Sequence, residues 1–144
     1  RLCAELRRLR PEIVFGADLI AGFPTESEAM FQNTLALVAD CGLTHLHVFP
    51  FSARPGTPAA KMPPVAPEIV KVRAKRLREA GAAALRKHLE AQTGKTLRVL
   101  TERGGTGRAE DFSRVKIGDV PPSQVVEMMI AGNDGKMLEA MSRA

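Results

Sequence analysis

The chain has 144 residues, of which 44% are hydrophobic and 26% charged, and its formal net charge is +5 with a pI near 9.7. This composition is typical of one ordinary globular domain or two small ones, and it excludes collagen, a disulfide scaffold and a wholly disordered chain. The apolar runs are far shorter than the roughly 20 residues of a membrane-spanning helix, so no membrane partner is expected. No signal peptide is recognisable, and because the first residue is not Met we expect a piece of a longer protein.

The positive charge is concentrated in one segment. Residues 66–92 carry seven Lys or Arg and three Asp or Glu, a net charge of +4, whereas residues 1–65 are neutral and residues 93–144 carry +1. A concentrated basic segment favours a polyanionic partner such as nucleic acid, although a solvated helix face has the same composition. Cys3 and Cys41 form no CxxC pair, which indicates buried thiols of a cytoplasmic protein, no disulfide and no metal site in this chain.

The first third of the chain alternates helical and extended patterns. Leucines at helical spacing predict a helix over residues 1–10, and continuous apolar residues within 13–23 predict a strand buried on both faces. A capping box at Thr25 and Glu28 predicts the start of the next helix, which ends at a glycine. A second strand over 43–51 completes a right-handed βαβ unit with a parallel sheet. The expected core side of the helix between the strands consists of Phe31, Leu35 and Val38.

A loop with five prolines, residues 52–67, follows the second strand at the edge where α/β folds bind ligands. Pro67 suits the first turn of a long helix that reaches about Gln92. The expected core side of this helix consists of Val70, Ala74, Leu77, Gly81, Ala84 and Leu85, and a basic stripe consists of Lys71, Lys75 and Arg78.

The last fifty residues change to short β-rich runs, at 96–101, 113–117 and 125–130, separated by glycine and proline turns. The turn Asn133-Asp134-Gly135 is a strong hairpin signal. Several short strands in so few residues predict a small, closed or nearly closed β-barrel of the OB type. The expected fold class is therefore α/β followed by a small antiparallel β-barrel.

Few side chains qualify as catalytic from the residues alone. His45 and His47 alternate on the second strand and face the same side, and we interpret them as core or ligand-facing residues rather than metal ligands. Asp18 is interpreted as structural. Arg54 lies on the rigid proline-rich loop, where it suits bidentate binding of a carboxylate or phosphate, with an ordinary surface cation as the equal alternative.

Two strings are specific enough to indicate a family. Residues 18–26, DLIAGFPTE, and residues 47–60, HVFPFSARPGTPAA, resemble the last two barrel strands of the methylthiotransferases, radical S-adenosylmethionine enzymes that modify tRNA or a ribosomal protein. The resemblance extends to a long helix and a C-terminal TRAM domain. It implies that residues 1–65 are the end of a partial (βα) radical S-adenosylmethionine barrel, residues 66–92 a basic connecting helix, and residues 93–144 a TRAM RNA-binding domain.

Within this family, Arg54 is unlike the ribosomal-protein branch. The run LHVFP at residues 46–50 resembles the branch that methylthiolates N6-threonylcarbamoyladenosine at position 37 of tRNA. The isopentenyladenosine branch and a non-catalytic RNA-binding module are the alternatives.

The resemblance implies S-adenosylmethionine and two [4Fe-4S] clusters for the parent protein. The family's cluster-binding cysteines match neither Cys3 nor Cys41, so we expect this chain alone to hold no cofactor and to be inactive. Its expected partners are tRNA and the missing N-terminal part of the same protein. Exposed sheet edges predict non-native dimerisation, strand exchange or disorder of the α/β part when the chain is isolated.

The resemblance also implies roles for single residues. The S-adenosylmethionine pocket would include Ile20, Gly22, Phe49, Phe51 and Ser52, and Gly22 is the strongest candidate because a glycine lets the chain approach a ligand. Arg54 would contact the substrate adenosine. The tRNA would be contacted by Lys71, Lys75, Arg78, Arg98, Arg108, Phe112 and Arg114. Phe112 would stack on a base between the phosphate contacts, with barrel core as the alternative role.

Overall fold

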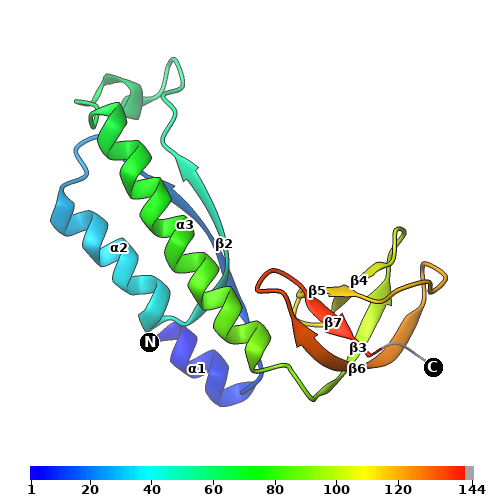
Figure 1. The fold of residues 1–144 in the computed structure, drawn as a ribbon. Helices are drawn as coiled ribbons and strands as arrows, with labels where there is room; N and C mark the ends of the chain where they lie inside the picture. Colours follow the sequence, from blue (N-terminus) through cyan, green and yellow to red (C-terminus); the bar gives the residue numbers. More distant parts are fainter. Residues whose placement is uncertain (142–144) are drawn as a thin grey trace. The chain divides into compact units, whose positions relative to one another are not determined.

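The computed structural model describes residues 1–141, which divide into two compact units, one of residues 1–84 and one that begins at Leu85 (Figure 1). Each unit has its own hydrophobic core. Within the described residues, no helix combines the length and the apolar character that a membrane crossing needs. The division proposed from the sequence, with a separate connecting segment at 66–92, stays a prediction.

The first unit contains two parallel strands and the helices that pack on them. The strands pair in register from Gly16 opposite His45 to Ala21 opposite Pro50, so the predicted parallel βαβ pairing is confirmed. A short 3₁₀-helix interrupts the proline-rich loop that follows. The elements are α1 (Leu2–Leu9), β1 (Phe15–Ala21), α2 (Glu28–Asp40), β2 (Leu43–Pro50), η1 (Pro58–Lys61) and most of α3 (Pro67–Glu90).

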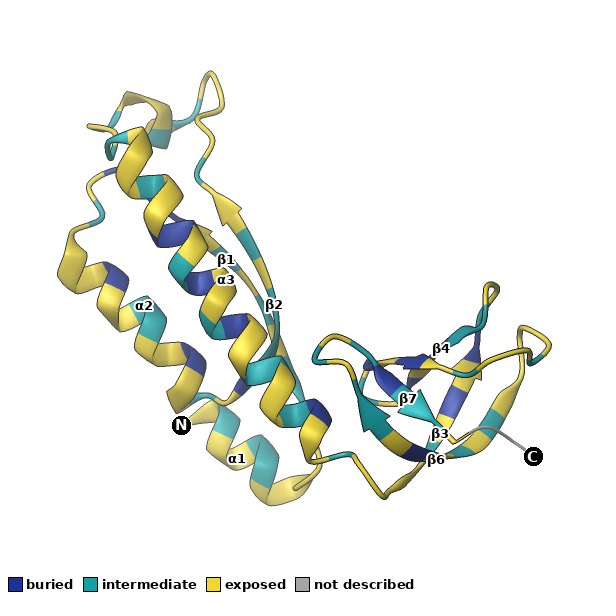
Figure 2. Cartoon of the chain, viewed as in Figure 1, coloured by how far each residue is buried: buried dark blue, intermediate teal, exposed yellow. Residues whose placement is uncertain are grey.

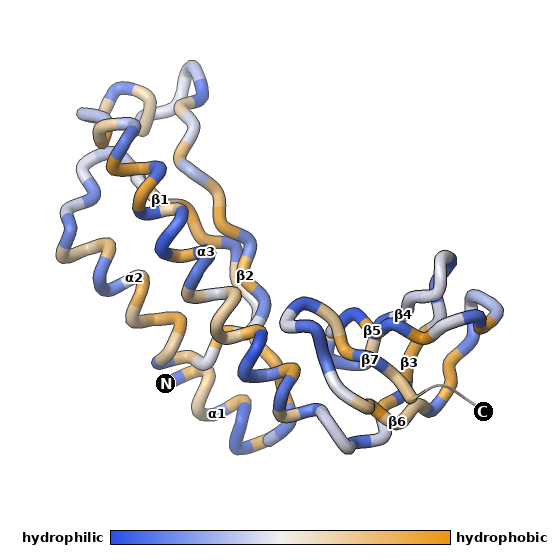
Figure 3. The backbone as a smooth tube through the Cα atoms, viewed as in Figure 1, coloured by the Kyte–Doolittle hydropathy of each residue, from blue (hydrophilic) through white to orange (hydrophobic). Residues whose placement is uncertain are grey.

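Burial alternates along β1, which corrects the expectation of a strand buried on both faces. Helices α2 and α3 lie on the same side of the two strands (Figure 1), so only one face of each strand is covered. Apolar residues nevertheless run along both strands (Figure 3), because the uncovered face is also partly apolar. The buried core of this unit consists of Ala21, Phe31, Val38, Leu43, Ala74 and Leu77.

The ends of the helices differ in part from the sequence predictions. The predicted capping box is wrong: α2 begins at Glu28 with Ser27 as its N-cap, whose hydroxyl accepts a hydrogen bond from the Met30 backbone N–H at 3.2 Å. Thr25 lies outside the helix with a φ of +69°. Because Glu28 is the first helical residue, its carboxylate is free to bind side chains of α3 instead of the backbone. The prediction that α2 ends at Cys41, just before a glycine, is confirmed.

Buried and exposed residues lie on different sides of α3 (Figure 2). Helix α3 begins at Pro67, as predicted, and buries Ala74, Leu77 and Gly81 on one side. Helix α1 behaves differently, because its Leu2 and Leu9 are 71% and 67% exposed. The leucine spacing therefore predicted the helix correctly, but the described residues do not cover its apolar side.

The second unit is a closed β-barrel with the strand order β3-β4-β5-β7-β6. The predicted small closed barrel is confirmed, but the expectation that it is antiparallel throughout is wrong, because β5 and β7 pair in parallel. Two of its strands, β4 and β7, were missed in the sequence because they have only four and three residues and little apolar alternation. The strands are β3 (Thr96–Thr101), β4 (Thr106–Ala109), β5 (Arg114–Lys116), β6 (Val125–Asn133) and β7 (Leu138–Ala140), and the core consists of Leu89, Val99, Ala109, Val115, Ile130 and Leu138.

Candidate cofactor and nucleic-acid surfaces

The uncovered face of the β1–β2 sheet presents an apolar pair at its carboxyl end. Ile20 and Phe49 are register partners on neighbouring strands, and each is 52% exposed. Asp18 and His47 are register partners on the same face, one step toward the start of the strands. This face therefore presents an exposed apolar pair next to a polar pair.

A separate pocket of about 460 Å³ lies where the strands end and α3 begins. Gly22 and Phe51 line it, together with the basic residues Lys71 and Arg78. Of the five residues expected to bind S-adenosylmethionine, two therefore line this pocket and two lie on the sheet face. Ser52 is exposed directly after β2. The structure thus brings the five to one end of the sheet without gathering them in one cavity.

Gly22 has a structural reason of its own to be glycine. Its φ is +77°, and an added Cβ would lie 2.4 Å from Cγ2 of Val70 on α3. The glycine therefore permits the chain to approach the helix closely. This contact explains the glycine without a ligand.

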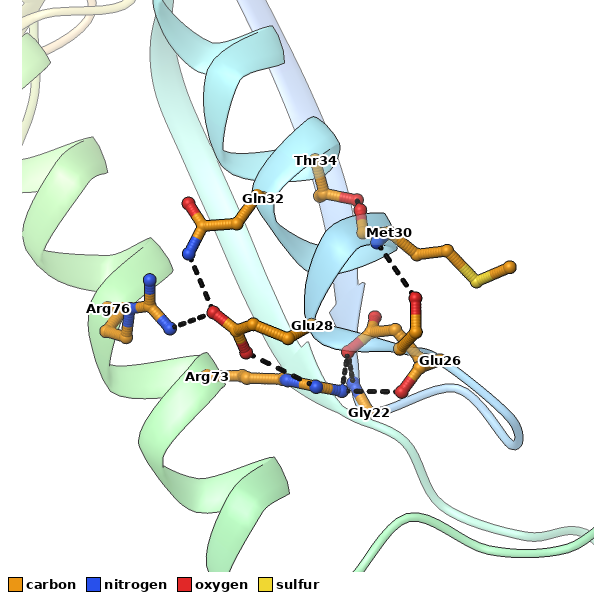
Figure 4. A network of polar contacts seen from close by, with 9 residues as sticks. Gly22, Glu26, Glu28, Met30, Gln32, Thr34, Arg73 and Arg76 are labelled. Carbon is orange, nitrogen blue, oxygen red and sulfur yellow. Dashed lines mark hydrogen bonds and ion pairs between the residues drawn. The ribbon is translucent and has the colours of Figure 1, made fainter.

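A buried ion pair that the sequence analysis missed holds the loop after β1 against α3 (Figure 4). Arg73 and Glu26 have side chains only 6% and 9% exposed, with 2.7 Å between Nη1 and Oε1. The same Glu26 oxygen accepts a hydrogen bond from the Gly22 backbone N–H, and the Glu26 carbonyl accepts one from Arg73. Glu28 binds Arg76 at 2.8 Å, and this bond, followed by one from Gln32, lowers its pKa.

Arg54 lies on the exposed loop after β2. Its carbonyl accepts hydrogen bonds from both the backbone N–H and the hydroxyl of Thr57, which closes a turn that contains Gly56 at a φ of +83°. The turn is thus closed by hydrogen bonds to the Arg54 carbonyl, and Arg54 itself is exposed.

The hairpin of β4 and β5 places two arginines directly opposite each other. Arg108 and Arg114 are register partners, and both are exposed. Like charges at opposed positions of a sheet destabilise it, unless an anion lies between or near them. Arg108 is partly neutralised by Glu102 at 3.2 Å. On the neighbouring strand β3, exposed Leu100 is the register partner of Arg108.

Phe112 occupies the turn between these two strands and is 71% exposed, so it is not barrel core. Of the two roles that the sequence left open for Phe112, barrel core is therefore excluded, and a role at the surface is left. The remaining basic candidates are exposed at different places: Lys71, Lys75 and Arg78 on α3, and Arg98 on β3. Arg98 pairs with Glu110 at 3.0 Å and Lys75 with Glu79 at 3.8 Å.

The described residues contain no cluster of three or more His, Cys, Asp or Glu side chains of the kind that holds a metal ion. Cys3 and Cys41 are free thiols and only half-buried, which corrects the expectation that they are buried. They are neighbours in space: the hydrogen bond with Cys3, followed by partial burial, raises the pKa of the Cys41 thiol. Two thiols are too few for the cysteine ligands of an iron–sulfur cluster, so the implied clusters do not fit this chain's own residues.

Comparison with known proteins supplies the family. No protein-family model matches the chain. It is 47% identical over 115 residues to a threonylcarbamoyladenosine tRNA methylthiotransferase of Rickettsia prowazekii, covering 80% of this chain and 27% of that protein. It is 33% identical over 146 residues to a tRNA-2-methylthio-N(6)-dimethylallyladenosine synthase of Ruegeria pomeroyi, covering 96% of this chain and 33% of the relative. A synthase of the same name from Novosphingobium aromaticivorans is 44% identical over 107 residues, covering 72% and 24%.

These relatives define a class of tRNA-modifying enzymes that attach a methylthio group to an adenosine. The chain belongs to this tRNA methylthiotransferase family, and the resemblance predicted from its two strings is confirmed. It spans a third or less of the length of these relatives.

Proposed function

We propose that the chain is the C-terminal part of an enzyme that methylthiolates N6-threonylcarbamoyladenosine at position 37 of tRNA in the cytoplasm. The observation that carries this proposal is the 47% identity over 80% of the chain to a relative of that name. The relatives named for dimethylallyladenosine that cover most of this chain are less similar, at 33% to 44% identity. They make the isopentenyladenosine substrate the second candidate.

The two substrates are distinguished by nucleoside analysis of cellular tRNA. If the gene that encodes this chain is deleted, we expect loss of the 2-methylthio group from threonylcarbamoyladenosine, with the isopentenyladenosine derivative unchanged. Loss of the isopentenyladenosine derivative alone would contradict the proposed substrate and favour the second candidate. Unchanged levels of both would contradict the proposed activity.

The first unit is proposed to close a (βα) radical S-adenosylmethionine barrel whose other strands belong to the preceding part of the same protein. The exposed sheet face supports this, since a two-stranded parallel sheet with one apolar face open is incomplete by the standards of α/β folds. When bound, S-adenosylmethionine supplies the radical chemistry together with clusters held outside this chain. Ile20 and Phe49 would pack on its adenine, and Ser52 and the backbone after β2 would meet its edge.

This role of the sheet face is tested in the longer protein. Ile20→Ser should weaken S-adenosylmethionine binding several-fold, because the serine removes apolar contact area from the ring face. Ile69→Ser is the matched control, since Ile69 is also exposed, at 43%, but lies on α3. Calorimetric titration measures both variants, and equal affinities in the two would contradict the assignment of the face.

The second unit is proposed to bind tRNA through the β4–β5 hairpin. The opposed Arg108 and Arg114, with exposed Phe112 between them in the chain, combine two cations for phosphates with a ring for base stacking. Such an arrangement costs stability in the free protein and becomes favourable when a polyanion neutralises it.

Salt dependence tests the electrostatic part of this proposal. If about four phosphates are engaged, the log–log slope of tRNA affinity against salt should be near −3 to −4. Arg114→Ala should reduce the slope by about one. Lys136→Ala removes the same charge from the exposed β6–β7 turn and should have less effect. Affinity that ignores ionic strength, or equal losses in the two variants, would contradict the hairpin as the binding site.

Arg54 is proposed to contact the carboxylate of threonylcarbamoyladenosine. In the longer protein, Arg54→Lys keeps the charge but loses the planar fork, so turnover should fall by one or two orders of magnitude, roughly 1.4–3 kcal/mol. Turnover of Arg54→Ala should fall by a similar factor if the planar guanidinium matters more than the charge. Unchanged turnover of Arg54→Lys would remove Arg54 from the substrate site.

A further inference from the structure

The turn between β4 and β5 has a phenylalanine at a position with left-handed backbone conformation. The Phe112 backbone N–H donates to the Ala109 carbonyl at 2.9 Å, and the Ala109 N–H donates to the Ser113 carbonyl at 2.9 Å. Phe112 has a φ of +65°, the left-handed conformation that glycine usually supplies in such turns. A residue with a side chain is disfavoured in this conformation, and the exposed ring recovers little of that cost by packing.

A histidine from α3 holds this turn. His88 Nε2 lies 2.5 Å from Oδ2 of Asp111, and both side chains are largely buried, at 15% and 18% exposure. The other carboxylate oxygen of Asp111 accepts a hydrogen bond from the Ser113 backbone N–H at 3.0 Å. Asp111 thus connects the helix to the residue that follows Phe112, and both of its oxygens are used.

The orientation of the His88 ring is set from the helix side. The side-chain amide of Gln92, which is a donor, lies 3.5 Å from Nδ1 of His88 and also donates to the His88 carbonyl at 3.3 Å. With Nδ1 facing this amide, Nε2 is the ring nitrogen that faces Asp111. The same end of α3 contributes Leu89 to the barrel core, so the helix turn that carries His88 is packed against the barrel.

We propose that His88 is a positioning residue that, through Asp111, holds the turn so that the Phe112 ring is presented to an unpaired RNA base. This inference rests on the proposed binding of tRNA by the hairpin. Backbone strain at an exposed aromatic residue is a pattern of binding sites, in which the surrounding structure fixes a conformation that the residue would not adopt alone. Fixing the ring before binding reduces the ordering cost of stacking.

The free protein provides the first test. His88→Leu keeps a similar volume but removes the ring nitrogen, so amide hydrogen exchange of Phe112 and Ser113 should become at least tenfold faster while the other strands of the barrel keep their protection. His88→Gln restores a donor and should recover part of this protection. Unchanged exchange in the turn of His88→Leu would overturn the inference.

RNA binding provides the second test, with an RNA stem-loop that carries 2-aminopurine at one unpaired loop position. The whole 144-residue chain should quench the fluorescence on binding, and Phe112→Ala should lose the quench and about tenfold in affinity. His88→Leu should lose several-fold, and the double variant should bind no more weakly than Phe112→Ala. Leu85→Ala is the control: this residue packs on the barrel core from α3, so it lowers stability without touching the turn.

The outcomes separate the inference from the function on which it rests. If Phe112→Ala weakens RNA binding and His88→Leu does not, or if the two losses multiply in the double variant, the positioning role is wrong while the RNA surface stands. If Phe112→Ala binds and quenches like the wild type, the RNA contact of Phe112 is itself wrong, and the positioning role is overturned with it.

Discussion

At the scale of single residues, two contacts with α3 fix the loop that follows β1. Gly22 meets Val70 where only a glycine fits, and Arg73 reaches past it to pair with Glu26. Neither contact is the packing of one apolar side chain against another. The loop after β1 is therefore positioned by backbone conformation and charge.

Substitution of Gly22 tests the first contact. Gly22→Ala should lower the free energy of unfolding by roughly 2–4 kcal/mol, since it combines an unfavourable φ with an overlap against Val70. Gly56→Ala is the matched control, because Gly56 has a φ of +83° but open space around its missing Cβ. Urea unfolding measures both. Equal losses would show that backbone conformation alone explains the glycine.

Removal of Arg73 tests the second contact. Arg73→Met should lower the free energy of unfolding by about 3–5 kcal/mol, because it leaves the Glu26 carboxylate buried without its cation. Arg8→Met removes a cation from the exposed Arg8–Glu5 pair and should have no measurable effect. A comparably small change in both variants would contradict a structural role for the buried pair.

At the scale of elements, the same helix serves both units with different residues. The part of α3 before residue 85 covers the β1–β2 sheet, and its last turns contribute Leu89 to the barrel core and His88 to the β4–β5 turn. The β4–β5 hairpin is in turn shaped by features that do not favour its own stability, namely opposed arginines and a phenylalanine at a left-handed position.

The cost of that conformation is measurable. Phe112→Gly should raise the free energy of unfolding by about 0.5–1 kcal/mol, because glycine adopts a φ of +65° without strain. Phe112→Ala keeps a Cβ and should be less stable than Phe112→Gly by about 1 kcal/mol. Thermal and urea unfolding measure both variants. A destabilised Phe112→Gly would mean that the ring contributes more packing than its exposure indicates.

At the scale of the whole molecule, pH links the turn to stability. Burial acts to raise the pKa of Asp111, but the pairing with His88 and the Ser113 N–H outweighs it, so the pKa lies below its ordinary value. A carboxyl group with a lowered pKa stabilises the folded state above the pKa of the unfolded chain, about 3.9, and loses this contribution as the pH falls.

Asp111→Asn tests this linkage. The variant should be less stable than the wild type at pH 7, and the difference should shrink as the pH falls from about 5 toward 3, because the wild-type carboxylate becomes protonated. Urea midpoints at several pH values measure the difference. A gap that stays constant over this range would show that ionisation of Asp111 contributes nothing to folding.

Features that depend on local chemistry could be predicted from the sequence. Pro67 at the start of α3, the glycine after α2 and the Asn133-Asp134-Gly135 turn between β6 and β7 each act within a few residues, and the structure confirms all three. The family also followed from two short strings, at residues 18–26 and 47–60, and the relatives confirm it.

Which surfaces these elements leave exposed could not be predicted, because it depends on contacts between residues far apart in the chain. Periodicity placed apolar residues along β1 but gave no means to know that helices cover one face alone, which leaves Ile20 exposed. The pairs Arg73–Glu26 and His88–Asp111 join residues 47 and 23 positions apart. Such pairs depend on chain crossings that local propensity does not encode.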